Sequence, residues 1–242
     1  MTTGIGHHIS RQFDTALEDI RSRVLAMGGL VEQQLRDALR ALMEGSSALA
    51  EFVLTNDHKV NAMEVAIDEE CVQVIARRQP AASDLRLLIA VIKTITDLER
   101  IGDEAERIAR MTVHLIDTGC AGERCFGMDA LFTRVQTMLH SALDAFARLD
   151  VDAAVAVARE DSKVNQEYVG LLRQQVTYMM EDPRTITRGI DIMWIARALE
   201  RIGDHTRNIG EYIVYLVRGK DVRHTSLEQM ERAAHGENGG SG

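Results

Sequence analysis

The sequence is poor in the residues that β-sheet proteins use most. Among 242 residues only 4% are aromatic and only two are proline. β-Sandwiches and barrels favour aromatic and β-branched residues with frequent turn breakers, so this composition argues against them. Leu, Ile, Val, Ala and Met carry most of the 45% of residues that are hydrophobic, which is too large a share for a disordered chain. The composition therefore predicts long helices around a hydrophobic core.

Cysteine and long apolar runs are also scarce. The three cysteines, Cys71, Cys120 and Cys125, are an odd number and lack the CxxC spacing of a zinc site, so we expect neither a disulfide framework nor structural zinc. No apolar run reaches the length of about 18 residues that a membrane span needs. The first residues, MTTGIGHHISRQF, lack the charged start and apolar centre of a secretory signal. We expect a cytoplasmic protein that meets a membrane only through its partners.

Positive charge is in deficit, because 28 basic residues face 37 acidic ones and the net charge is −9. An acidic surface repels nucleic acid and anionic lipid, so neither is an expected partner, whereas divalent cations and proteins are compatible with it. The chain has no GxxxxGKS or GxxxxGKT, no GxSxG and no HExxH motif. Nucleotide hydrolysis and nucleophilic catalysis therefore lack a basis in the sequence, and we expect no enzyme.

The chain contains the same pattern twice. The hexapeptide LERIGD at residues 98–103 recurs unchanged at residues 199–204, an offset of 101. Upstream, DHKVN at residues 57–61 matches DSKVN at residues 161–165, an offset of 104. The difference of three residues falls near Pro80 and Pro183, where loops are expected. The repetition predicts two copies of one three-helix unit.

The predicted fold is all-α, with two tandem homologous three-helix bundles and six long helices. Val53, Val60, Ile67 and Val74 recur every seven residues, as in the seam of a bundle. We expect helices near residues 10–43, 47–78 and 84–117 in the first unit and near residues 128–149, 152–180 and 186–218 in the second, with a linker at 119–127. The predicted domains are residues 1–120 and 121–224, followed by a disordered tail at 225–242.

Paired carboxylates are the candidate functional residues. Glu99 and Asp103 are four residues apart and project from one helix face, and Glu200 and Asp204 repeat the pair. Both glutamates lie on a stripe that is otherwise apolar. A carboxylate withdrawn from water costs several kcal/mol unless it is protonated, paired or bound to metal. The repeated pair therefore predicts a metal site in each bundle.

The second helix of the first unit carries a complementary stripe of oxygen ligands. The stripe consists of Asp57, Asn61, Glu64 and Asp68. Antiparallel packing of this helix on the next would bring the stripe to the carboxylate pair. In the second unit only Asp161 and Asn165 remain, because Tyr168 and Leu172 occupy the positions of the two other acids. The first site is therefore predicted to be richer in ligands.

Oxygen ligands without cysteine suit magnesium, manganese, calcium or iron, and zinc is possible. Three alternatives remain open. The glutamates could instead pair with arginines across a helix interface, or the chain could be a metal-free structural helical module. A carboxylate-bridged di-metal enzyme is less favoured, because such sites add a Glu-x-x-His motif that this sequence lacks. Gly102 and Gly203, within the repeated hexapeptide, predict close helix–helix contact.

Three strings resemble the PhoU family, the phosphate-uptake regulators of bacteria: ERIGD at 99–103 and again at 200–204, VNAMEVAIDEEC at 60–71, and RRQPAASDLRL at 77–87. The resemblance covers about residues 7–224. It implies a cytoplasmic homodimer of two-bundle chains. It also implies clusters of iron or zinc bound through paired E(D)xxxD motifs, which Glu99/Asp103, Glu200/Asp204 and Glu64/Asp68 match.

The resemblance further implies a regulatory function. Members of the PhoU family restrain the phosphate-starvation response and link the ATPase subunit of the phosphate ABC importer to a phosphate-sensing membrane histidine kinase. We therefore expect a negative regulator that acts as an adaptor between these two partners, with iron, zinc, manganese or magnesium bound by its carboxylates.

Overall fold

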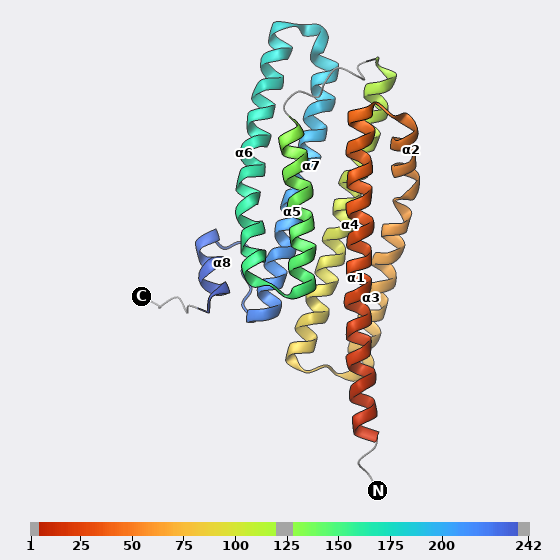
Figure 1. Cartoon of the computed structure of the whole chain (residues 1–242), viewed down its shortest axis with the longest axis vertical. Helices are drawn as coiled ribbons and strands as arrows, with labels where there is room; N and C mark the ends of the chain where they lie inside the picture. The colour runs from red at the N-terminus through yellow and green to blue at the C-terminus, as the bar shows by residue number, and fades with distance from the viewer. Residues whose placement is uncertain (1–4, 120–127, 237–242) are drawn as a thin grey trace.

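The structure is a computed structural model that describes residues 5–119 and 128–236, with side chains described from residue 13 (Figure 1). The helices are α1 (Ile5–Glu44), α2 (Ser47–Asn56), α3 (His58–Arg78), α4 (Ala82–Asp117), α5 (Met128–Arg148), α6 (Val151–Glu181), the short 3₁₀ turn η1 (Pro183–Thr185), α7 (Ile186–Arg218) and α8 (Leu227–Ala234). The described residues contain no strand. The all-α prediction of two three-helix bundles is confirmed, and most helix bounds lie within two residues of those expected.

Equivalent turns start the second helix of each bundle. Ser46 and Asp150, 104 residues apart, each accept a hydrogen bond from the backbone N–H three residues ahead, as N-caps do. The residue before each cap has a positive φ, 63° at Gly45 and 53° at Leu149. This left-handed conformation reverses the chain after the first helix. The repeat therefore extends to the backbone geometry of the turns.

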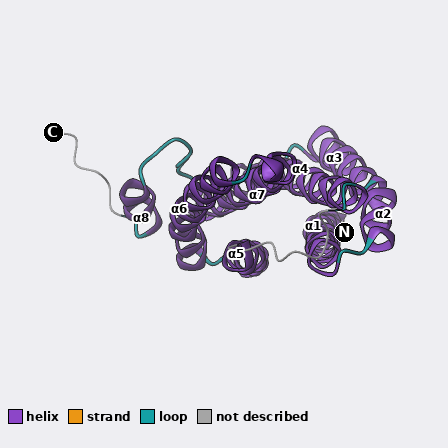
Figure 2. Ribbon diagram, turned by 90° about the horizontal axis from the view of Figure 1, so that it is seen from above, coloured by secondary structure: helices purple, strands orange, loops and turns teal. Residues whose placement is uncertain are grey.

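The helices form two layers (Figure 2). Helices α3, α4, α7 and α6 form a row, and α1 and α5 lie along one side of it. Helices α4 and α7 are the centre of the row and share the most extensive helix–helix contact. Each also packs within its own bundle, which explains the stretch of α4 that is apolar nearly all round. The two bundles therefore share one continuous core.

Polar contacts fix the register of α4 against α7. His205 Nδ1 lies 2.7 Å from Asp97 Oδ1, and Arg201 Nε lies 3.0 Å from Glu104 Oε1. The earlier acid of α4 thus meets the later residue of α7, so the two helices run antiparallel. Asp97 and Glu104 are both buried, and such acids are tolerated because they are paired.

The second helix of the first bundle differs from the prediction, because it breaks at Asp57 into α2 and α3. Side chains around the break bond to backbone carbonyls: Asn56 Nδ2 donates to Phe52 O at 2.7 Å, and His58 Nδ1 lies 2.7 Å from Thr55 O. Such bonds compete with the regular helix. In the second bundle α6 continues through the equivalent position, so the repeat is symmetric in placement but not in continuity.

The prediction of a disordered tail is wrong for residues 227–234, which form α8. Ser226 and Gln229 make a capping box at its start, and Met230 is buried against the rest of the molecule. Arg159 of α6 bonds to Glu231 at 2.8 Å. Helix α8 lies beside α6 at the edge of the molecule (Figure 1).

Two further expectations fall outside the described residues. Cys120 and Cys125 lie in the segment 120–127 that the structure does not describe, as does nearly all of the predicted linker. Over the described part of the chain, no helix has the length and apolarity that crossing a bilayer requires.

Candidate functional site

In the first bundle the carboxylate pair lies on α4, facing α3. The side chain of Glu99 is 16% exposed and that of Asp103 is 37% exposed. Burial raises the pKa of Glu99 above its ordinary value, and the negative charge of Asp103 raises it further. Arg100 bridges the pair from the outside, with Nε 3.4 Å from Glu99 Oε2 and Nη1 3.2 Å from Asp103 Oδ2. The site is acidic, and the side chain of Arg100, the cation paired with it, is about half exposed.

Asp57 approaches this pair from the break between α2 and α3. It is buried and accepts two amide hydrogen bonds, from Gln34 Nε2 at 2.7 Å and from Asn61 Nδ2 at 3.2 Å. A Cβ at Gly102 would lie 3.5 Å from Asp57 Oδ1 and 3.4 Å from the Val60 side chain. Gly102 therefore permits close contact of α4 with α3, as predicted from the sequence.

Of the two other acids of the predicted stripe, Glu64 and Asp68, only Glu64 acts on the carboxylate pair. Its negative charge, with that of Asp57, helps to raise the pKa of Glu99. Asp68 lies one turn further along and acts instead on the Cys71 thiol, whose pKa burial, followed by the charge of Asp68, raises to about 12. The charges of Asp57 and Glu64 therefore act on the Glu99 of the carboxylate pair, and Asn61 bonds to Asp57.

In the second bundle the equivalent acids are Asp161 on α6 and Glu200 and Asp204 on α7. Asp161 and Glu200 are 4% and 8% exposed. Burial raises the pKa of both, and the charge of Asp204 raises it further. Asn165 Nδ2 donates to Asp161 Oδ2 at 3.4 Å, as its counterpart does in the first bundle. Gly203 again permits the approach, because a Cβ there would lie 3.1 Å from the Val164 side chain.

Two arginines enter the second site. Arg207 Nη1 donates to Asp161 Oδ2 at 3.4 Å, while its Nε donates to the buried Glu211 at 3.1 Å. Arg197 Nη1 donates to Glu200 Oε1 at 2.6 Å, and its guanidinium lies 6.0 Å from the centre of the Tyr168 ring. Glu200 is thus paired with an arginine of its own helix α7, and not with one across a helix interface as the predicted alternative had it.

Several buried oxygens at the two sites have no hydrogen-bond partner. They are Gln34 Oε1 and Glu99 Oε2 in the first bundle and Asp161 Oδ1 and Glu200 Oε2 in the second. Buried polar atoms are normally satisfied by a donor, a proton, a water or a cation. Carboxylate and amide oxygens are the ligands that hard cations prefer, so the donor set fits such an ion. Over the described ranges, however, no three acidic, histidine or cysteine side chains converge into a metal-binding group.

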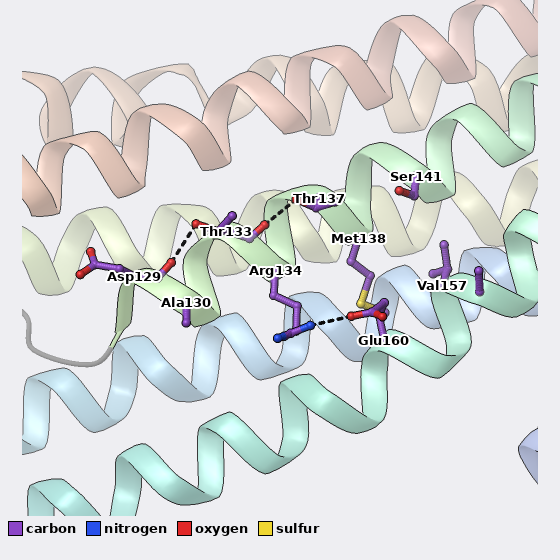
Figure 3. Close-up of a pocket in the computed structure, with 10 residues that line it drawn as sticks. Asp129, Ala130, Thr133, Arg134, Thr137, Met138, Ser141, Val157 and Glu160 are labelled. Atoms are coloured by element: carbon purple, nitrogen blue, oxygen red, sulfur yellow. Dashed lines mark hydrogen bonds and ion pairs between the residues drawn. The ribbon is translucent and has the colours of Figure 1, made fainter.

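A groove of about 620 Å³ lies apart from these sites, between α5 and α6 (Figure 3). Arg134 points across it to Glu160, and also donates to Glu167 at 2.7 Å. The positive charge of Arg134 is therefore already neutralised, and the groove is not an anion site. The equivalent groove of the first bundle is about 110 Å³, because Phe52 stands there at the position of Ala156.

The comparisons with known proteins match both bundles. The family model for the PhoU domain matches residues 24–112 and 129–213. The chain belongs to the PhoU family. It is 53% identical to the "phosphate-specific transport system accessory protein PhoU homolog" of Pseudomonas aeruginosa, over 96% of both chains. It is 48% identical to the protein named "phosphate-specific transport system accessory protein PhoU" in Escherichia coli K12, again over 96% of both.

Two solved members of the family have the same fold. The crystal structure of PhoU from Pseudomonas aeruginosa superposes with a TM-score of 0.83 at 53% identity, covering 86% of this chain and all of that one. The phosphate transport system regulatory protein PhoU from Streptococcus pneumoniae gives a TM-score of 0.80 at 31% identity, with 87% and 99% covered. The resemblance found in the sequence motifs is therefore confirmed.

Sequence reasoning missed three residues that shape the sites: Gln34, Arg197 and Arg207. Gln34 comes from α1, a helix to which no role was assigned. The two arginines could have been found by aligning the repeats, because Thr96 and Glu106 stand at their positions in the first copy. A neutral residue and an acid replaced by arginine beside a retained acid is a visible signal of pairing.

Proposed function

We propose that this chain is a regulatory accessory protein of phosphate uptake, which restrains the phosphate-starvation response from the cytoplasm. It acts without catalysis, as an adaptor between the ATPase subunit of a phosphate ABC importer and a membrane histidine kinase that senses phosphate. The observation that carries this proposal is identity of 53% across 96% of both chains with a protein named as an accessory of phosphate-specific transport.

Exposed apolar side chains at equivalent repeat positions support a role in binding other proteins. Val65 and Val72 on α3 are exposed, and so are Val169 and Val176 at the matching positions of α6. Both helices belong to the four-helix row of Figure 2. Exposed apolar groups gathered on one element are typical of interaction surfaces. They suit the proposed importer, kinase and homodimer contacts.

The carboxylates of both bundles would hold a cation such as iron, zinc, manganese or magnesium. The candidate ligands are Asp57, Asn61, Glu64, Glu99 and Asp103 in the first bundle and Asp161, Asn165, Glu200 and Asp204 in the second. Asp68, whose charge acts on Cys71, lies further from this set. A bound cation would neutralise acids that burial leaves costly and would join the second helix of each bundle to the third.

A metal-free helical module is the second candidate, and one observation favours it: no three acidic, histidine or cysteine side chains converge in the described ranges. Elemental analysis of protein purified without chelator separates the two. Metal that is retained by the wild type and lost from Glu99→Gln/Glu200→Gln supports the carboxylate sites. Metal content that is unchanged in this variant excludes both glutamates as ligands.

Deletion of the gene tests the regulatory proposal. In phosphate-rich medium, a reporter of phosphate-starvation genes should rise strongly on deletion and return to its basal level when the wild-type gene is restored. Pull-down of the full chain should recover the importer ATPase and the sensor kinase. A variant with surface changes remote from the sites, Arg148→Gln/Arg184→Gln, serves as the matched control. A reporter unchanged by deletion would end this proposal.

A further inference from the structure

The groove between α5 and α6 has a counterpart in the first bundle. Seven of the residues that line it stand 104 positions after residues that line the first-bundle groove. The two grooves are therefore built from the same positions of the repeat, yet their volumes are about 620 Å³ and about 110 Å³. Phe52, about half exposed, lines the smaller groove, whereas Ala156 stands at its position in the larger one. The first bundle thus covers with its own aromatic side chain a surface that remains accessible in the second.

The surface of the larger groove is mainly apolar and has low walls. Met138 of α5 and Val157 of α6 form its floor, and each is only 2% exposed. Ala130, Thr133 and Ala156 are exposed along its edges. The distance between two packed helices depends on the side chains at their contact, so these small residues permit the close approach of another helix.

The groove follows α5 for about three turns. Figure 3 shows Asp129 at one end and both Ser141 and Val157 towards the other. Asp129 and Ser141 are twelve residues apart, which is about 18 Å along a helix. An amphipathic helix places its apolar face into elongated apolar grooves of this kind. A compact small molecule would contact only part of that length.

The charges that line the groove differ in whether they are already paired. Arg134 bonds to Glu160 and Glu167, and Glu160 also accepts a hydrogen bond from Lys163 at 2.6 Å. These four charges neutralise one another. Asp129 is exposed, and no residue in the part of the chain that the structure describes forms an ion pair with it. A partner with a basic side chain at this end is therefore complementary in charge.

We propose that the groove between α5 and α6 binds an amphipathic helix of a partner protein. The helix presents an aromatic side chain that lies over Met138 and Ala156, at the place that Phe52 occupies in the first bundle. About three turns away, a lysine or arginine of the same helix pairs with Asp129. This inference rests on the groove alone, so it depends neither on bound metal nor on a role in phosphate uptake.

A synthetic helical peptide tests the proposal on the full-length protein. The peptide is based on alanine and leucine, is about 18 residues long, and carries Phe and Lys about eleven residues apart on one face. Two versions with the order of Phe and Lys reversed cover both helix directions. Binding is followed through the NMR signal of the ¹³C-labelled methyl group of Met138, which Met138→Leu identifies.

The Met138 signal should shift and saturate with one of the two peptides. Replacement of the peptide's Phe by Ala should weaken binding by about tenfold, because a buried aromatic side chain anchors the helix. The absence of any shift at about 1 mM of either peptide would overturn the inference. So would equal binding of the Phe and Ala peptides, and this comparison needs no change in the protein.

The decisive protein variant is Ala156→Phe, which gives the second bundle the side chain of the first. It should weaken peptide binding by about tenfold or more, since its own ring covers the place of the anchor. Phe52→Ala is the matched control at the equivalent position of the other bundle, and it should leave the dissociation constant unchanged. Equal losses in both variants, or no loss in Ala156→Phe, would refute the assignment to this groove.

The charge and the shape of the partner are tested separately. Asp129→Asn should weaken binding of the Lys peptide by about threefold and leave a peptide with Gln in place of Lys unaffected. N-acetylphenylalaninamide should bind at least about tenfold more weakly than the peptide, because it contacts only one end of the groove. Equal affinity would show a site for small aromatic molecules and overturn the helix assignment. The regulatory proposal fails separately, through a starvation reporter that deletion leaves unchanged.

Discussion

The two bundles have the same framework around the candidate sites but satisfy the same buried acid in different ways. In each, a glycine of the repeated hexapeptide lets the third helix approach an aspartate and a valine of the second. Asp57 is then held by two neutral amides, whereas Asp161 is held by one amide and one guanidinium.

This comparison shows which residues of the sites are determined by helix packing and which are determined by the need to neutralise or bond a buried acid. Close helix contact favours a small residue at both positions, because a Cβ would already touch the facing valine, at 3.4 Å for Gly102 and at 3.1 Å for Gly203. A buried acid needs only some donor, and a glutamine, an asparagine and an arginine all qualify. Sterically determined residues therefore repeat, while the donors that bind the acid have changed and the net charge of the site with them.

Enlarging the two glycines should have the largest effect. Gly102→Leu and Gly203→Leu should each lower the free energy of unfolding by about 3 kcal/mol, measured by urea denaturation. Gly203→Leu should cost more, because its Cβ would lie 3.1 Å from Val164, against 3.4 Å from Val60 at Gly102. Gly170→Leu on α6 is the control, since nothing lies within 4 Å of a Cβ there. An equal loss in the control would refute the steric explanation.

Helix α8 packs only on the second bundle. Its loss should therefore destabilise the second bundle and leave the first bundle unchanged. Met230→Ala removes a side chain that is 2% exposed and should lower stability by about 2 kcal/mol. Hydrogen exchange should accelerate in α8 and along the facing part of α6, while α3 retains its protection. Equal acceleration in α3 would show that α8 supports the whole molecule.

The pH dependence of stability should also differ between the bundles, by less than the effects of the substitutions above. The pKa of Glu99 and of Glu200 is raised in the folded protein, so the folded state holds these protons more tightly than the unfolded state does. Stability of the metal-free protein should therefore fall as pH rises from the ordinary value of about 4.5 through the raised values. Glu200→Gln and Glu99→Gln should each flatten this fall, followed as Tm in chelator between about pH 5 and pH 8.

The second bundle should account for more of that fall, because burial raises the pKa of Asp161 as well as that of Glu200. Glu200→Gln should therefore leave a residual slope assigned to Asp161. An unaltered slope in both glutamine variants would show that other groups govern the pH dependence.

The smallest effect is expected at the groove of Figure 3. Arg134→Leu places in the second bundle the residue that the first has at position 30, and it removes the ion pairs to Glu160 and Glu167. These side chains are about a third exposed, so the loss should stay below about 1 kcal/mol in urea denaturation. A larger loss would show that Glu167, whose Oε2 is buried without a partner, depends on this arginine for its burial.

The sequence was sufficient for the main helices, because heptad spacing and the repeated strings depend on local residues alone. Val53, Val60 and Ile67 are buried as the seven-residue period predicted. The break at Asp57 was missed, since it depends on side chains that bond to backbone carbonyls inside an otherwise helical pattern. Helix α8 was missed although its capping box is visible as Ser226 and Gln229, because its short apolar face gains stability only by docking.

The candidate site was predictable where one helix carries it and less so where several helices meet. Glu99 and Asp103 share a face by their spacing, and Gly102 indicated the close contact correctly. Gln34 comes from α1, more than twenty residues before Asp57, and no local pattern connects the two. Asp68 follows the stripe in sequence, but helix geometry carries it past Glu99 towards Cys71.

The antiparallel pairing of α4 with α7 makes each half of the chain depend on the other for its solvent shielding. Separation of the halves would expose the buried acids Asp97 and Glu104 without His205 and Arg201, together with the apolar surface around them. Lys93, which lies 5.5 Å from the ring centres of both Tyr212 and Tyr215, would lose two aromatic neighbours at the same time. We therefore expect the duplicated halves to unfold together, because buried groups of α4 depend on partners from α7.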